Sequence, residues 1–293
     1  MKLGLHIAAT NWRRGPERLG ETLAHAAEAA EAAGFDAISV TDHVWGSQYT
    51  GGVEASQVEA YTTLGFIAAR TQRVRLLTLA TAASYRHAGL LAKTVTTLDV
   101  LSGGRAMLGI GAGDYSDEAQ GLGLPFPSAT ERYEQLEETV QACLRMWHGQ
   151  SGDQRPFRSK HINMARPLNA PQSLSRPHPP ILIAGGGERR TLPLVARYAD
   201  ACNIPPSPEL PQKLELLKRL CDDAGRDYNA IEKTAPFAFD VGADGSKVPE
   251  LLGRLRWLGS LGVQTVFGWV VGVDDIRPIE VMGHEVIPAV AEV

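Results

Sequence analysis

The sequence predicts an α/β fold, a (β/α)8 TIM barrel, and three observations lead to that prediction. Short runs rich in Val, Ile and Leu alternate with longer stretches of helical period, which is typical of repeated βα units around a parallel sheet. Eight such units can be counted, and 293 residues with 44% hydrophobic content can bury one large core. An open doubly wound sheet is the alternative, but it usually needs fewer units and would leave the late alternation unexplained.

The eight expected strands are short apolar segments that are each followed by a helical stretch. They are KLGLHIA from Lys2, DAISVT from Asp36, VRLLTLATA from Val74, RAMLGIGAG from Arg105, PILIAG from Pro180, DACNI from Asp200, EKTAPFAF from Glu232 and VQTVFGWV from Val263. The first helical stretch, ERLGETLAHAAEAAEAAG, ends on Gly34. A glycine in that place is a common helix stop.

One interval is longer than a loop between a helix and a strand requires. This interval runs from about residue 150 to 178 and is rich in Pro, Arg, Asn and Ser. It lies between the helix YEQLEETVQACLRMWHG and the strand at Pro180. We expect this segment to be an insertion over the barrel mouth, with a small hairpin in FRSKHINM from Phe157. No repeat or low-complexity tract marks a second domain, so residues 1–293 are expected to form one barrel domain.

Composition narrows the class of partner. The formal charge of -4 and the pI near 6.1 give no electrostatic reason to expect nucleic acid or an anionic membrane surface, and they favour a small-molecule substrate. The N-terminal apolar run is brief and no stretch approaches the roughly 18 apolar residues of a membrane span, so we expect a cytoplasmic protein. Cys143, Cys202 and Cys221 lack CxxC spacing, which argues against a disulfide framework or a zinc site.

The second expected strand ends in an acid and a histidine, Asp42 and His43. In a TIM barrel the residues at the carboxyl ends of the strands carry the chemistry, and an imidazole can move protons near neutral pH. The alternative is structural: Asp42 would cap the next segment and His43 would bond to a neighbour.

Two other expected strands end in glycine. The fourth ends GIGAGDY, in which Gly109, Gly111 and Gly113 would let backbone approach a flat or phosphorylated ligand, and Asp114 follows at once. The fifth ends IAGGGERRTL, in which Gly185, Gly186 and Gly187 open a helix where amides would favour a phosphate. Neither run has GxGxxG spacing, and both could simply form turns.

At this point the sequence resembles the bacterial-luciferase-like flavin and deazaflavin oxidoreductases, particularly the branch that uses coenzyme F420. The resemblance runs over nearly the whole chain. It rests on AAGFDAISVTDHVWG from Ala32, EAYTTLGFIAARTQRVRLLT from Glu59, YRHAGLLAKTVTTLDVLSGGRAMLGIGAGDY from Tyr85, GLPFPSATERYEQLEETVQACLRMW from Gly123 and PPILIAGGGERRTLPLVARYADACNI from Pro179. The third segment is the most specific.

The resemblance implies a cofactor with its ring in the barrel mouth and its phosphate near the fourth and fifth strands. Asp42 and His43 would lie beside the ring, and Glu59 would lie in the mouth unless it serves only as a helix cap. A bulge in the third strand, often with a cis peptide before a residue other than proline, would press on the ring; it would consist of Thr78, Leu79, Ala80 and Thr81. Gly111 and Gly113 would pass under the cofactor, while backbone amides of Ala184, Gly185, Gly186 and Gly187 would bind the phosphate.

The implied reaction is hydride transfer between the coenzyme and a small organic substrate. Such a step usually needs a proton moved on a second atom, and His43 is the expected acid or base, with Asp114 as second choice. The alternatives are a monooxygenase that uses reduced FMN and a non-catalytic flavin-binding barrel. We expect a homodimer that binds no metal.

Two positions differ from the pattern of relatives that oxidise sugar phosphates. Those relatives have a glutamate where this chain has Asp114, and their tryptophan stands slightly further past the histidine than Trp45 does. Nor does the sequence contain an obvious pair of lysines that could bind the phosphate group of such a substrate. The sequence thus gives no support for a sugar phosphate as substrate.

Overall fold

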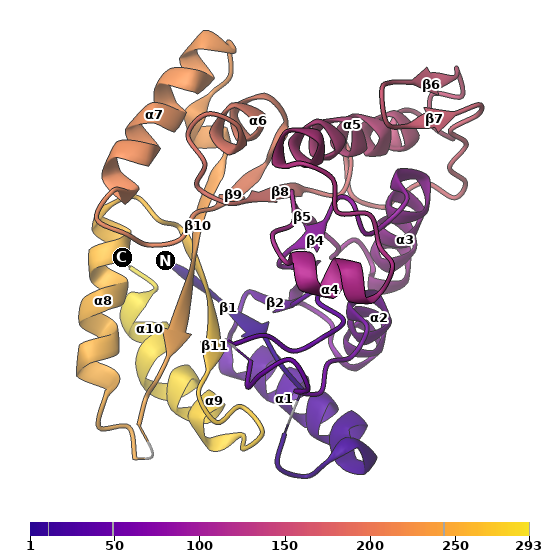
Figure 1. Cartoon of the computed structure of the whole chain (residues 1–293). Helices are drawn as coiled ribbons and strands as arrows, with labels where there is room; N and C mark the ends of the chain where they lie inside the picture. The colour runs from indigo at the N-terminus through magenta and orange to yellow at the C-terminus, as the bar shows by residue number, and fades with distance from the viewer. Residues whose placement is uncertain (11, 49, 243, 293) are drawn as a thin grey trace.

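A computed structural model describes residues 1–10, 12–48, 50–242 and 244–292 and shows parallel strands surrounded by helices (Figure 1). The strands of the main sheet, in spatial order, are β3 (Arg75–Thr78), β2 (Ala37–Val40), β1 (Lys2–Ile7), β11 (Thr265–Val270), β10 (Glu232–Phe239), β9 (Ala201–Asn203), β8 (Ile181–Ala184), β5 (Leu108–Gly111) and β4 (Thr81–Ala82). The remaining strands, β6 (Phe157–Arg158) and β7 (Asn163–Met164), form an antiparallel pair.

The main sheet closes on itself because β3 and β4 are two parts of one barrel strand. β3 pairs with β2 on one side, β4 pairs with β5 on the other, and an isolated bridge joins Leu76 to Ala106. Counting β3 and β4 together gives eight barrel strands among the described residues, one in each predicted segment. The predicted (β/α)8 barrel is therefore confirmed.

Helices cover the outside of the barrel (Figure 1). They are α1 (Leu19–Ala33), α2 (Ala60–Arg70), α3 (Ala88–Ser102), α4 (Ser116–Gly121), α5 (Ala129–Trp147), α6 (Thr191–Tyr198), α7 (Leu210–Asp223), α8 (Val248–Ser260), α9 (Arg277–Val281) and α10 (Ile287–Val290), with a π-helical turn at Met282–Val286. As predicted, α1 ends at Gly34, which has a left-handed φ of 94°. None of the helices in the described ranges is long and apolar enough to cross a membrane.

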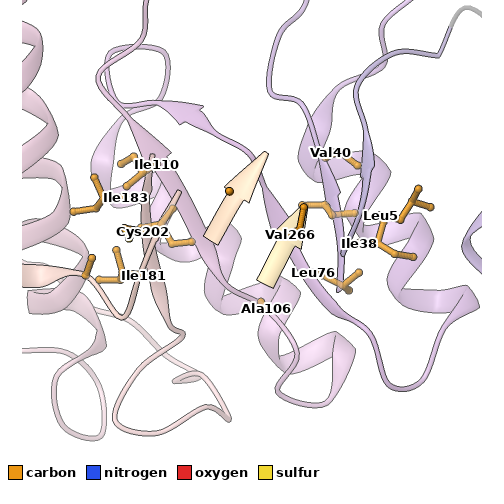
Figure 2. Close-up of a cluster of buried hydrophobic side chains, with 14 of the residues drawn as sticks. Leu5, Ile38, Val40, Leu76, Ala106, Ile110, Ile181, Ile183, Cys202 and Val266 are labelled. Carbon is orange, nitrogen blue, oxygen red and sulfur yellow. The ribbon is translucent and has the colours of Figure 1, made fainter. Parts of the chain in front are cut away.

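The core has two layers because alternate residues of a strand point to opposite faces. Figure 2 shows the outer layer, in which residues such as Leu5, Ile38 and Ile183 point from the strands toward the helices. The inner layer fills the barrel axis with Ala37, Leu77, Met107, Leu182, Ala201 and Phe267. The three cysteines are buried and free, and burial raises the pKa of the Cys143 and Cys202 thiols to about 12.

Charged residues close the amino-terminal end of the barrel. Arg75 donates to both oxygens of Glu232, at 2.9 and 3.1 Å, and its Nε donates to Asp36 at 2.7 Å. Burial raises the pKa of Glu232, but the hydrogen bond and the charge of Arg75 outweigh burial and leave this pKa below its ordinary value. We refer to Arg75, Asp36 and Glu232 as the floor cluster.

The long segment before β8 contains the predicted hairpin, in which Phe157 pairs with Met164. Its predicted position over the barrel mouth needs correction. Lys160 of the hairpin binds Glu134 of α5 at 2.7 Å, and further along, the Ser175 hydroxyl donates to Asp99 of α3 at 2.7 Å. The segment therefore packs against the outside of α3 and α5, and Figure 1 places the hairpin at the edge of the molecule. Proline content predicted the loop but not the surface that it covers.

Candidate functional site

The carboxylate of Asp42, at the end of β2, lies in a network of hydrogen bonds at the barrel mouth. It is 5% exposed. Arg86 donates to both of its oxygens, at 2.6 and 3.0 Å, and Thr81 Oγ1 donates to it at 2.7 Å. Arg86 also donates to Glu59 at 2.7 Å, and Glu59 caps α2 by accepting from the amides of Tyr61 and Thr62. Glu59 thus does both things that the sequence left open: it caps a helix and lies at the mouth.

His43 is held by a buried acid. Its Nδ1 lies 2.9 Å from Oε2 of Glu118, a residue of α4 with 0% exposure. Glu118 also accepts from the backbone amides of Val44 and Trp45, at 2.5 and 2.9 Å, and from the Tyr85 hydroxyl at 2.9 Å. With four donors around it, this carboxylate fixes both the histidine ring and the backbone that follows.

The surroundings of His43 favour its charged form. The hydrogen bond to Glu118 raises the pKa of His43, burial lowers it, and the negative charges of Glu118, Asp114 and Asp42 raise it further, so the net pKa lies above the ordinary value. Burial raises the pKa of Glu118, but its bonds to His43 and to the Trp45 amide outweigh burial and lower this pKa overall. Glu118 is therefore ionised at neutral pH.

Asp114, the second-choice acid or base, is exposed at the start of the loop before α4. Among the described residues, its interaction with His43 is electrostatic only: the negative charge of Asp114 raises the pKa of His43. Tyr115 beside it makes an edge-on ring contact with His43, with ring centroids 5.6 Å apart.

Another histidine, His6, lies on the inner face of the barrel and forms a hydrogen bond with Ser39 at 2.9 Å. Burial lowers the pKa of His6 to about 4, so this side chain stays neutral at ordinary pH.

The predicted bulge in the third barrel strand is present between β3 and β4. The peptide bond from Leu79 to Ala80 is cis, a position that the sequence left open. Thr78 Oγ1 donates to the carbonyl of Gly109 at 2.9 Å. A Cβ on Gly109 would stand 1.8 Å from the Thr78 carbonyl oxygen, so only glycine fits beside this carbonyl.

The glycines after Gly109 border open space at the mouth. A Cβ on Gly111 would meet its nearest atom, the Ala184 carbonyl oxygen, at 3.7 Å, and Gly113 has a left-handed φ of 76°. Near Gly113 the hydroxyl of Ser84 is buried and has no hydrogen-bond partner in the part of the chain that the structure describes. An unpaired buried hydroxyl beside a glycine edge is what a polar ligand group could satisfy.

The triple glycine follows β8, which lies beside β5 in the sheet. The amide of Gly185 donates to the Asn203 carbonyl at 2.9 Å, whereas the amides of Gly186 and Gly187 donate to no group among the described residues. A turn separates these glycines from α6, which begins at Thr191, so they do not open the helix directly. A Cβ on Gly186 would point toward the Lys213 ammonium group, 3.3 Å away.

The structure thus joins Asp42, Glu59, Thr78 and Thr81 in one network and places His43 next to it. Gly111, Gly113 and the turn from Ala184 to Gly187 lie on the adjoining strands. Sequence reasoning missed Glu118, Tyr85 and Arg86. The last two stand in the YRHAG motif that carried the resemblance, whereas Glu118 is 75 positions from His43 and only an acidic helix start could have indicated it. The described residues contain no group of three or more His, Cys, Asp or Glu side chains that could hold a metal.

Comparisons with known proteins show what this chain resembles. Residues 1–266 match the family model described as luciferase-like monooxygenase. A relative from Beutenbergia cavernae, named F420-dependent glucose-6-phosphate dehydrogenase, is 39% identical over 122 residues, which is 41% of this chain and only 35% of the relative. The chain thus spans about a third of the length of that curated relative.

Solved structures share the fold at low sequence identity. An F420-dependent secondary alcohol dehydrogenase in complex with an F420-acetone adduct has a TM-score of 0.81 at 18% identity and covers 99% of this chain and 98% of its own. The monooxygenase RslO1 from Streptomyces bottropensis has a TM-score of 0.78 at 20% identity and covers 98% of this chain and 99% of its own. On the match of its first 266 residues to the family model, the chain belongs to the luciferase-like monooxygenase family.

Proposed function

We propose that this chain is an oxidoreductase that uses coenzyme F420 to transfer a hydride to or from a small organic substrate, with His43 moving the accompanying proton. The observation that supports this most is the hydrogen bond from His43 to the buried Glu118 at the mouth of the barrel. The names of the relative from Beutenbergia cavernae and of the secondary alcohol dehydrogenase give further support for the coenzyme.

The residues at the mouth fit a flat, phosphorylated cofactor. Gly111 and Gly113 provide a side-chain-free edge under a ring, and the unpaired Ser84 hydroxyl offers a polar contact there. The two unpaired glycine amides and Lys213 offer donors and a positive charge for a phosphate. When bound, the deazaflavin would supply the carbon that accepts or gives the hydride.

His43 is prepared for proton transfer at one particular atom. An ionised carboxylate accepts hydrogen bonds but cannot donate them, so the proton between Glu118 and His43 belongs to Nδ1. In the neutral ring, Nε2 then carries the lone pair, and this atom takes up or gives the proton. The side chain is 34% exposed, so Nε2 can meet a substrate from the mouth. Glu118 positions the ring and stabilises its charged form.

We expect this protein to bind coenzyme F420 more tightly than FMN. The alternative, a monooxygenase that uses reduced FMN, is supported by the family's description and by the RslO1 structure. Calorimetric titration of the purified protein with each cofactor measures both affinities. FMN bound at least as tightly as F420 would overturn this expectation, and a tightly bound flavin without turnover would favour the non-catalytic barrel.

Replacement of Gly186 by Asp should abolish most of the affinity for the phosphorylated cofactor. The new carboxylate would point toward Lys213 and cancel its charge, and it would repel a phosphate at the neighbouring amides. Gly20→Asp is the matched control, because Gly20 is exposed on α1 and a Cβ there meets no atom within 4 Å. Calorimetry on both variants tests the placement, and unchanged affinity in a folded Gly186→Asp protein would refute it.

Replacement of Glu118 by Gln should lower the pKa of His43. Glutamine keeps an oxygen for the Val44 and Trp45 amides but removes the negative charge that stabilises the imidazolium. The wild-type pKa is raised, so the protonated ring persists to higher pH, and in the variant it should lose its proton at lower pH. The midpoint of the pH–rate profile should move to lower pH whether His43 acts as base or acid.

NMR titration of the His43 ring without coenzyme measures the same shift independently of turnover. Asp117→Asn provides the control, because it removes one negative charge from the exposed face of the same helix. A His43 titration that moves equally in both variants would show that Glu118 has no specific role.

The expected homodimer remains a prediction. Sedimentation velocity of the purified protein would measure its oligomeric state directly.

A further inference from the structure

A cavity of about 530 Å³ lies beside the carboxyl-terminal half of β10. Its apolar walls are formed by Pro206, Pro236, Phe237, Ala238, Leu251 and Trp269. We call this cavity the β9–β10 slot. It occupies the side of the barrel formed by the last strands, whereas Asp42 and His43 follow β2 and the glycine edges follow β5 and β8. Volumes of this size are typical of sites for small molecules.

The slot exists because β10 loses its partner halfway along. β10 pairs with β11 from Thr234 to Phe239, but with β9 only as far as Thr234. The Ile204 amide donates to the Thr234 carbonyl at 3.0 Å, so the backbone polar groups of Thr234 face β9. Two residues further on, Pro236 faces the same way and has no N–H to donate. Pro206, which follows β9 in the chain, lines the slot as well.

Trp269 brings an aromatic surface to the slot. Register pairs Gly4 with Phe267, and a Cβ on Gly4 would meet the Phe267 ring, so Phe267 points into the barrel. Trp269, two residues later on the same face, points into the barrel at its mouth and remains 45% exposed. Its indole N–H donates to no side chain or carbonyl among the described residues. Large apolar side chains are usually buried, so an indole that lines a cavity and remains this exposed is unusual.

The charged side chains around the slot neutralise one another. Lys247 Nζ donates to Asp240 at 2.5 Å, and Arg254 Nε lies 3.6 Å from Glu250. All four residues line the slot, so two positive charges meet two negative ones. A phosphate would have to compete with these carboxylates for its cations. The balance of charge therefore disfavours an anion and favours an uncharged ligand.

We propose that the β9–β10 slot binds an uncharged, apolar ring of the substrate against the indole of Trp269, and that the substrate is therefore a neutral organic molecule rather than a sugar phosphate. The assignment of this ligand as the substrate rests on the proposed function. The slot lies at the carboxyl ends of β10 and β11. His43 follows β2 at this same end of the barrel, so a molecule whose ring occupies the slot is proposed to extend its reacting carbon toward His43.

Equilibrium dialysis of the coenzyme-free protein with 1-(2-naphthyl)ethanol tests the proposal. This probe is a neutral alcohol with a planar ring. We expect Trp269→Ala to bind it about tenfold more weakly or worse. Trp257→Ala is the matched control, since Trp257 is also 45% exposed but lies outside the slot, and it should bind the probe like the parent.

A second variant covers the case in which Trp269→Ala fails to fold. Ala238→Leu adds volume inside the slot and should weaken the probe by a similar factor. Equal affinity of the parent, Trp269→Ala and Ala238→Leu proteins, or no measurable binding to the parent, would overturn the proposal. Binding of glucose 6-phosphate that displaces the probe would overturn it too.

The outcome is separable from that of the proposed function because dialysis involves neither coenzyme nor turnover. Probe binding that depends on Trp269, together with failure to bind F420, would leave the slot assigned and reject the coenzyme. Tight F420 binding without Trp269-dependent binding of the probe would support the coenzyme and reject the assignment of the slot.

Discussion

The variant His43→Ala is expected to bind coenzyme F420 nearly as tightly as the parent and to lose about 10²-fold or more in turnover, the usual scale for a general acid or base. The reason is that, on the proposed function, Nε2 carries the transferable proton, while Nδ1 is held by Glu118. Binding should persist because the proposed contacts to the ring lie on β5 and the proposed contacts to the phosphate lie in the turn after β8 and at Lys213. Coenzyme titration and single-turnover kinetics on the same preparation measure both quantities.

A purely structural imidazole predicts the opposite ranking. Loss of His43 would remove one of the four donors to the buried Glu118 and lower the melting temperature, while turnover per folded molecule would stay largely intact. A stable, coenzyme-loaded His43→Ala protein with near-normal turnover would show that His43 is not the proton carrier. Asp114, whose charge already acts on His43, would then be the next residue to replace.

Gly109→Ala is expected to destabilise the whole barrel, by about 2–4 kcal/mol. Its Cβ would stand 1.8 Å from the carbonyl oxygen of Thr78, and this neighbour is backbone that cannot rotate away. Thr78 also bonds to Gly109 through its side chain, so displacement of one strand breaks that contact as well. Urea unfolding of the variant and the parent measures the difference in the free energy of unfolding.

Gly111→Ala is the matched control for this experiment. A Cβ on Gly111 has no neighbour closer than 3.7 Å, so the variant should unfold at nearly the parent's urea concentration. It should nevertheless bind the coenzyme less well, because the added methyl group would occupy the proposed ring site. Equal stability of Gly109→Ala and the parent would mean that the third barrel strand can move aside freely.

The sequence predicted the barrel well because the signals for strands are local. Buried parallel strands consist of short apolar runs, and all eight such runs became barrel strands. The bulge from Thr78 to Thr81 was implied by family resemblance, not by any residue pattern. The cis bond lies within this bulge, between Leu79 and Ala80, and the sequence did not locate it among these four residues.

Contacts between distant parts of the chain account for what the sequence did not predict. Glu118 meets His43 only because β2 and the segment after β5 end at the same mouth, and a surface helix start such as SDEAQ looks like an ordinary solvated face. Trp269 stands in the expected strand VQTVFGWV, yet its side chain is 45% exposed. It lines the β9–β10 slot together with Pro236 of the neighbouring strand, and analysis of single segments cannot bring these two residues together.

The filled axis of the barrel determines where a proton can leave. Below the mouth, the inner layer holds apolar side chains such as Leu77 and Met107 beside the hydrogen bond between His6 and Ser39, and beneath them the floor cluster holds Arg75 between two carboxylates. A proton needs a chain of hydrogen-bonding groups to move, and apolar packing interrupts such a chain. The side chain of His43 is 34% exposed at the mouth, so it can exchange a proton with water there directly. On the proposed function, a substrate seated over His43 would also close this outlet, and the transferred proton would then stay with the protein until the product departs.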